Sequence, residues 1–195
     1  MLRGLPVLDV WETCRSLALT LSIDELTAVI DFVITGDIRR PPLSDLLGMK
    51  AYLARHEHHP GIVRLRRAAV QARAGSWSPR ETQLRLLVTR AGIPEPELNV
   101  PLLLPDHRTV IPDLGWPAYR VAAEYNGAHH NRPGQRIHDL RRIDDYLDIG
   151  WTTVNIEKTE LLQHPDSAVF RVAQRLESQG WTPTRAIRKR CGLPG

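Results

Sequence analysis

The stretch IPDLGWPAYRVAAEYN, from Ile111 to Asn126, decides the fold of this chain. It contains two strand-like runs with a turn at Trp116-Pro117 between them, which is the pattern of a β-hairpin. The first run carries Asp113 and the second carries Glu124. Carboxylate oxygens are the ligands that hard divalent cations prefer. The stretch therefore predicts a hairpin that holds a cation site.

The elements on either side of this hairpin alternate between helical and strand-like patterns. Apolar residues recur at helical spacing in some segments and form short β-type runs in others. The expected elements are helix 78–92, strands 98–104, 109–114 and 119–125, helix 135–148, strand 151–156 and helix 166–179. This order predicts an α/β sandwich with a mixed central sheet.

The first part of the chain has a different, helical character. Ser22 is a suitable cap for a helix over 23–35, and Pro41-Pro42 separates it from further helices. The run Ala74-Gly75-Ser76-Trp77 is a natural boundary. We therefore expect a small helical N-terminal domain over 1–75, an α/β domain over 76–183, and a basic tail over 184–195 that is mobile or solvated.

Composition permits a nucleic-acid-binding protein and argues against a membrane or secreted protein. Of 195 residues, 26 are basic and 22 acidic, which gives a net charge of +4. Such a balance permits nucleic-acid binding. No apolar run is long enough to span a bilayer, no signal peptide is evident, and the two cysteines are isolated. We expect a cytoplasmic protein with no membrane partner and with DNA as its main partner.

The hairpin geometry suggests how the cation is held. A tight turn at Pro117-Ala118 pairs Asp113 with Ala122, so Glu124 lies diagonal to Asp113 on the same face. Asn126 shares that face because strand side chains alternate. These oxygens and the main-chain carbonyl near residue 125 are the expected ligands of Mg²⁺ or Mn²⁺. The cation would lower the pKa of a bound water and polarise a phosphodiester.

Each of these acidic residues has a simpler interpretation. Glu81, in Ser78-Pro79-Arg80-Glu81, is a candidate catalytic residue, but it also fits a capping box. Asp113 also fits a turn aspartate. Glu124 follows an apolar run, where an unpaired carboxylate is costly. A metal, an arginine partner or protonation must compensate, and we favour the metal.

Downstream residues extend the candidate site. His129 is placed to activate water as a general base, although a solvated loop histidine is an equal interpretation. Arg141 and Arg142 lie on the next predicted helix and are candidates for contacts with phosphate oxygens. A solvated helix face with charge pairs explains these two arginines equally well.

These residues together resemble a known family. SPRETQLRLLVTRAGIPEPELN, IPDLGWP, VAAEYNGAHH and DLRRIDDYLDIGWTTVNI are similar to actinobacterial endonuclease-like proteins related to the very-short-patch-repair endonucleases, in the PD-(D/E)XK superfamily. The resemblance implies a restriction-endonuclease-like sandwich and a Mg²⁺-dependent DNA endonuclease. It gives Glu81, Asp113, Glu124 and His129 catalytic roles, with His129 replacing the usual lysine.

The chain departs from the family at Asn126, where aspartate is usual. The amide oxygen of Asn126 is still a neutral ligand for a cation, but one negative charge is lost. The helical N-terminal region resembles part of the antitoxin-like proteins of abortive-infection systems, which implies a protein partner. The alternative function is therefore a catalytically weakened DNA-binding or regulatory module of a defence or toxin–antitoxin system.

Overall fold

The computed structural model describes residues 7–36, 41–127 and 133–194, and for 133–140 it describes the backbone alone. Within these ranges the chain divides into two compact units, Met1–Gln83 and Leu84–Gly195. The division falls inside helix α5 (Pro79–Ala91), shortly after the boundary expected at residues 75 and 76.

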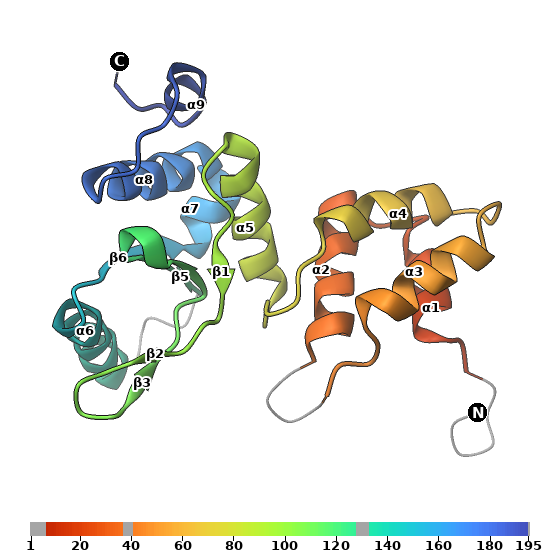
Figure 1. Ribbon diagram of the computed structural model, residues 1–195, viewed down its shortest axis with the longest axis horizontal. Helices are drawn as coiled ribbons and strands as arrows, with labels where there is room; N and C mark the ends of the chain where they lie inside the picture. Colours follow the sequence, from red (N-terminus) through yellow and green to blue (C-terminus); the bar gives the residue numbers. More distant parts are fainter. Residues whose placement is uncertain (1–6, 37–40, 128–132, 195) are drawn as a thin grey trace. The chain divides into compact units, whose positions relative to one another are not determined.

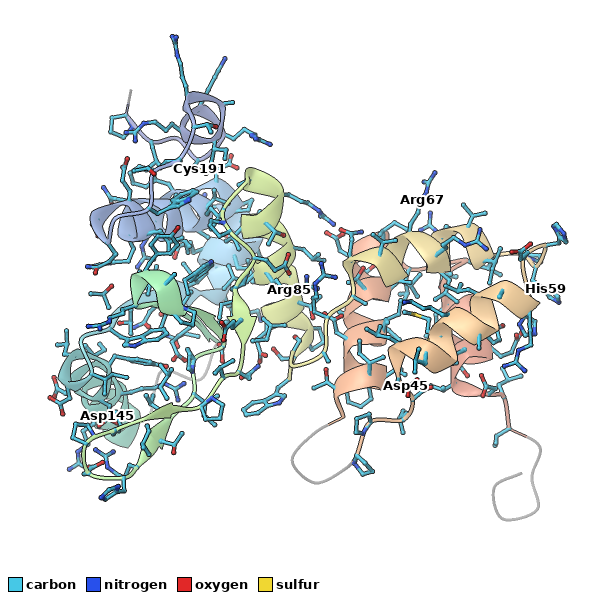
Figure 2. All side chains as sticks on the ribbon, viewed as in Figure 1. Asp45, His59, Arg67, Arg85, Asp145 and Cys191 are labelled. Carbon is cyan, nitrogen blue, oxygen red and sulfur yellow. The ribbon has the colours of Figure 1, made fainter. Side chains whose placement is uncertain are left out.

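The described part of the first unit is helical (Figure 1). Its helices are α1 (Val10–Leu17), α2 (Ile23–Thr35), α3 (Leu46–Arg55), α4 (Ile62–Gln71) and the start of α5. Ser22 caps α2 as expected: its Oγ accepts from the Glu25 N–H at 3.2 Å, and Glu25 Oε2 accepts from the Ser22 N–H at 2.8 Å. Asp45 caps α3 by accepting from the Gly48 N–H at 2.7 Å (Figure 2).

A buried carboxylate joins α2 to the segment after α4 and to the first turn of α5. Asp31 on α2 is 1% exposed. Its oxygens accept from the Arg73 N–H at 2.7 Å and from the Thr82 hydroxyl at 2.8 Å. Because a buried charge without such donors is costly, these bonds hold Arg73 of the connecting segment and Thr82 of α5 against α2. The surrounding core is apolar and is built from residues such as Leu26, Ile30, Leu65 and Ala68.

The second unit is built on a mixed sheet in the order β1-β4-β5-β6. Its strands are β1 (Glu97–Leu98), β4 (Leu114–Trp116), β5 (Val121–Asn126) and β6 (Thr152–Glu157), and a separate pair is formed by β2 (Leu102–Leu103) and β3 (Thr109–Val110). The two long strands expected before residue 115 are thus each divided. Asn99 has φ 49°, which is incompatible with a continuous strand there.

Strand direction follows from the connections. β4 and β5 are antiparallel and joined by a short 3-10 turn, η1 (Pro117–Tyr119). β5 and β6 are parallel, which requires a crossover, and α6 (Pro133–Asp148) supplies it. The predicted α/β class with a mixed sheet is confirmed in the described part of the chain.

The two faces of the sheet have different coverings (Figure 1). Val121, Ala123, Val154 and Ile156 lie in the main core, which also contains residues of α5, α7 (Lys158–Gln163) and α8 (Pro165–Ser178). The alternate residues face α6 and the β2–β3 pair, where Ala122, Tyr146 and Trp151 form a smaller cluster. The α6 face is less apolar, and it contains the candidate site.

The C-terminal segment is not the mobile or solvated tail that we expected. Thr184 caps a short helix, α9 (Arg185–Arg190), and the following Cys191 and Leu193 belong to the main core (Figure 2 labels Cys191). Cys191 is 2% exposed and Leu193 is 7% exposed. The basic composition of the segment suggested a solvated tail. The burial of Cys191 and Leu193 instead makes the segment part of the second unit.

Candidate functional site

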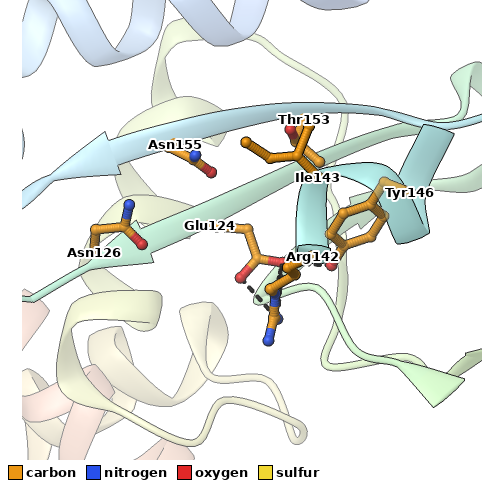
Figure 3. Close-up of a pocket in the computed structure, with 7 residues that line it drawn as sticks. All are labelled: Glu124, Asn126, Arg142, Ile143, Tyr146, Thr153 and Asn155. Carbon is orange, nitrogen blue, oxygen red and sulfur yellow. Dashed lines mark hydrogen bonds and ion pairs between the residues drawn. The ribbon is translucent and has the colours of Figure 1, made fainter. Parts of the chain in front are cut away.

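Alternation along two parallel strands builds the floor of the candidate site. The register pairs Glu124 with Asn155 and Asn126 with Glu157. Since every second side chain of a strand points to the same face, these four side chains and Thr153 share the face toward α6. Together with Arg142, Ile143 and Tyr146 of α6, most of them line a small pocket of about 30 Å³ (Figure 3).

Glu124 lies at the centre of this pocket and is 9% exposed. Arg142 donates to it from Nε, at 3.1 Å from Oε1, and from Nη2, at 2.8 Å from each carboxylate oxygen. The Tyr146 hydroxyl also donates to Oε1. Arg142 and Tyr146 are one helical turn apart on α6, so both reach the same carboxylate. Of the three compensations considered for Glu124, the structure places an arginine beside it.

The carboxylate changes the acidity of its partners. Burial alone would lower the pKa of Arg142, but the charge of Glu124 raises this pKa above its ordinary value. Burial raises the pKa of Tyr146, and the charge of Glu124 raises it further. Both side chains therefore stay protonated donors throughout the physiological pH range. The Arg142 Nη2 also donates to the carbonyl oxygen of Ile111 at 2.5 Å.

Asp113 lies directly before β4, next to the site. The observed register pairs Leu114 with Ala123, and one further step along the strands places Asp113 opposite Glu124. The Asp113 Oδ2 accepts from the Tyr125 N–H at 2.7 Å. Continued by one residue, this register is in line with the expectation that Asp113 and Glu124 share a face, but Asp113 lies just outside the strand that was expected to include it.

The predicted pairing of Asp113 with Ala122 is wrong by two residues. The register pairs Trp116 with Val121, so the connection spans four residues, including η1 and Arg120 at φ 51°. The predicted pairing of Asp113 with Ala122 requires a turn of two residues. A shift of two preserves the face on which each side chain lies, whereas a shift of one would have reversed it.

Asn126 has a direct polar partner on the neighbouring strand. Its Nδ2 donates to the Glu157 Oε1 at 3.2 Å. Glu157 was not among the predicted site residues, and neither was Tyr146. The alternation of polar residues in β6 (Thr153, Asn155, Glu157) and the helical spacing of Arg142 and Tyr146 were the signals available in the sequence.

The remaining predicted residues lie in different settings. The Glu81 carboxylate accepts from the Trp77 N–H at 2.8 Å, and the Glu81 N–H donates to the Ser78 Oγ at 3.2 Å, so Glu81 has its capping role. Arg141 and Arg142 are both exposed on α6, and Arg142 also lines the pocket. His129 lies outside the described residues. The catalytic role of Glu81 stays a prediction.

A hard cation at this site would have to keep much of its water. Asp113 and Glu124 offer carboxylate oxygens from adjacent strands, and Asn126 carries an amide oxygen. Mg²⁺ commonly binds one or two carboxylates and retains several waters. Across residues 7–36, 41–127 and 133–194, no group of three or more His, Cys, Asp or Glu side chains is placed to hold a metal ion. A cation at Glu124 would therefore have few protein ligands and would have to compete with the hydrogen bonds from Arg142 and Tyr146.

Comparison with known proteins gives relatives without an assigned activity. Two uncharacterized proteins, from two strains of Mycobacterium tuberculosis, are each 30% identical to the chain over 118 residues. The match covers 60% of this chain and 44% of each relative, so the chain spans less than half the length of these curated relatives. No family model and no solved structure matches. In the part of the chain that the structure describes, no helix is long and apolar enough to cross a membrane.

Proposed function

We propose that the second unit is a metal-dependent DNA endonuclease of the restriction-endonuclease-like class, similar to the very-short-patch-repair endonucleases. The observation that carries this proposal is the pairing of β4 with β5, whose register, continued by one residue before Leu114, sets Asp113 opposite the buried Glu124. The order of elements from α5 to α8, with a mixed sheet between helices, supports the sandwich class.

Each residue of the site has a role in this proposal. Asp113 and Glu124 hold the cation, with Asn126 as a neutral oxygen ligand in place of the usual aspartate. Arg142 and the exposed Arg141 bind phosphate oxygens, and His129 accepts a proton from the attacking water. When bound, Mg²⁺ or Mn²⁺ would supply charge stabilisation at the scissile phosphate. Because Tyr146 is buried, it positions Glu124 and does not contact DNA.

The second candidate is a DNA-binding or regulatory module that does not cleave. Two observations favour it. Glu124 already has charged and neutral donors in Arg142 and Tyr146, and the amide of Asn126 brings no negative charge. This candidate predicts DNA binding that Mg²⁺ does not convert into product. Sensitivity of binding to salt is common to both candidates and cannot separate them.

A calorimetric titration of the full chain with Mn²⁺ tests the proposal. We expect saturable binding to the wild-type chain and loss of binding in Asp113→Asn and Glu124→Gln, since each removes one carboxylate. Asp148→Asn removes an exposed carboxylate from the end of α6 and serves as the matched control, with unchanged binding. Equal Mn²⁺ affinity in all three variants would reject the assigned ligands, and absence of binding to the wild type would favour the second candidate.

A further inference from the structure

Arg142 has an unusual pair of properties for a residue beside a buried carboxylate. Its guanidinium bonds to both oxygens of Glu124, yet its side chain is 44% exposed, whereas that of Glu124 is 11% exposed (Figure 3). Its bond to the Ile111 carbonyl comes from the same Nη2 atom that contacts Glu124. Arg142 thus reaches the carboxylate from the solvent side of the pocket.

A cation at Glu124 has to compete with this guanidinium. Both are positive, and both require the same carboxylate oxygens. At hydrogen-bond separation two like charges repel strongly unless water screens them. Since Glu124 is fixed on the central strand β5 and Arg142 extends from the surface helix α6, the guanidinium is the group that can move out into solvent.

We propose that Arg142 is a displaceable counter-ion of Glu124, which leaves the carboxylate when a divalent cation binds and then bonds to a phosphate oxygen of DNA. This inference rests on the proposed function and gives it an order of events. Without a cation, Arg142 and Tyr146 neutralise and orient Glu124. With a cation, Tyr146 keeps its contact and the guanidinium fork is released to the mouth of the pocket. A fork of this kind binds phosphate through two parallel hydrogen bonds.

The exchange predicts coupling between the two ligands. Phosphate that binds Arg142 removes the competitor from Glu124, so DNA strengthens metal binding, and metal strengthens DNA binding by the same factor. A chain of this design holds the cation weakly until nucleic acid is present. If Arg142 is instead a fixed structural partner of Glu124, it stays on the carboxylate in every state. DNA then does not change the affinity for the cation, and the cation does not change the affinity for DNA.

The first test is a Mn²⁺ titration of Arg142→Met by calorimetry beside the wild type. Loss of the competing charge should tighten Mn²⁺ binding about tenfold, within the usual range for coupled ligands. Arg142→Lys keeps the positive charge but not the forked guanidinium, so its Mn²⁺ affinity should lie between those of the wild type and Arg142→Met. Arg175→Met, which replaces an exposed arginine of α8 outside the site, should keep the wild-type affinity. An Arg142→Met affinity equal to the wild-type value would overturn the inference.

Thermal unfolding of the same variants shows whether a change in Mn²⁺ affinity comes from a folding defect. Without metal, Arg142→Met should unfold at a lower temperature than the wild type, because Glu124 has lost its charged partner. Saturating Mn²⁺ should raise the unfolding temperature of Arg142→Met more than that of the wild type. A larger shift in the wild type would contradict displacement.

The second test measures the coupling directly, with a short DNA duplex whose phosphorothioate linkages resist hydrolysis. The duplex should tighten Mn²⁺ binding to the wild type and leave Arg142→Met unchanged. The same tightening in both would overturn the transfer of Arg142 to phosphate. If Arg142→Met binds Mn²⁺ more tightly but no form of the chain cleaves DNA, the displacement of Arg142 is supported and the proposed endonuclease activity is rejected. If neither form binds Mn²⁺, both proposals are rejected.

Discussion

At the scale of single residues, the hydroxyl of Tyr146 links helix α6 to the carboxylate of Glu124. Tyr146 is 1% exposed, and its hydroxyl donates to Glu124. Tyr146→Phe should therefore lower the free energy of unfolding by about 1.5–3 kcal/mol, as for other bonds to charged groups. Urea unfolding measures this cost. Tyr119→Phe, on the half-buried η1 turn, is the control, and an equal cost in both variants would contradict the role of the bond.

A second residue-scale prediction concerns the pH dependence of stability. Hydrogen bonds from Arg15 and then from Tyr52 lower the pKa of Glu12 from 4.5 to about 2. A lowered pKa in the folded state stabilises the protein above the unfolded pKa and loses this effect as the pH falls. Stability should therefore decline between pH 4.5 and about 2, and less so in Glu12→Gln. Parallel stability curves for the two chains would contradict this account.

Residue chemistry in the sequence predicted part of the site. The apolar run before Glu124 indicated burial, and burial implied a compensating partner. Which partner compensates depends on how α6 is rotated about its axis, and that is set by packing of Tyr146 and Ile143 rather than by local sequence. For this reason Arg142 was predicted to contact phosphate or to belong to a solvated helix face, and the arginine partner considered for Glu124 could not be identified as Arg142.

At the scale of elements, Gly61 sets where α4 begins. It has φ 88°, and a Cβ at this position would lie 2.5 Å from the carbonyl oxygen of Arg15. Gly180 has φ 95° with nothing within 4 Å of such a Cβ. Gly180→Ala should thus cost about 1 kcal/mol from backbone strain alone, and Gly61→Ala distinctly more. Urea unfolding of both variants measures the two losses of stability. Equal losses would mean that α1 shifts to make room for the methyl group.

Elements were predicted well where side-chain periodicity fixes them. The helices over 23–35 and 79–91 and the strands β5 and β6 were recognised within a few residues. The divided strands before residue 115 were not; in the first of them Asn99 adopts a left-handed φ angle that composition does not specify. Likewise the loop between β4 and β5 could not be foreseen, since Arg120 adopts φ 51° without being glycine.

At the scale of the whole molecule, each unit has its own hydrophobic core. The core of the second unit includes Leu84 and Val88 of α5 at one end of its sequence, and Cys191 and Leu193 at the other. We predict that a fragment 76–195 folds cooperatively, and that a fragment 76–183, which lacks α9, is less stable by about 2–4 kcal/mol. Thermal unfolding compares the two fragments, and equal stability would show that α9 does not contribute to the core.

The central claim is that Glu124 holds a catalytic cation, and nicking of supercoiled plasmid DNA tests it most directly. The wild-type chain should nick the plasmid with Mg²⁺ or Mn²⁺ and not with a chelator, and Glu124→Gln, with its fold checked by circular dichroism, should not nick it under any of these conditions. Equal nicking by Glu124→Gln, or no nicking by a wild-type chain that binds DNA, would contradict the claim.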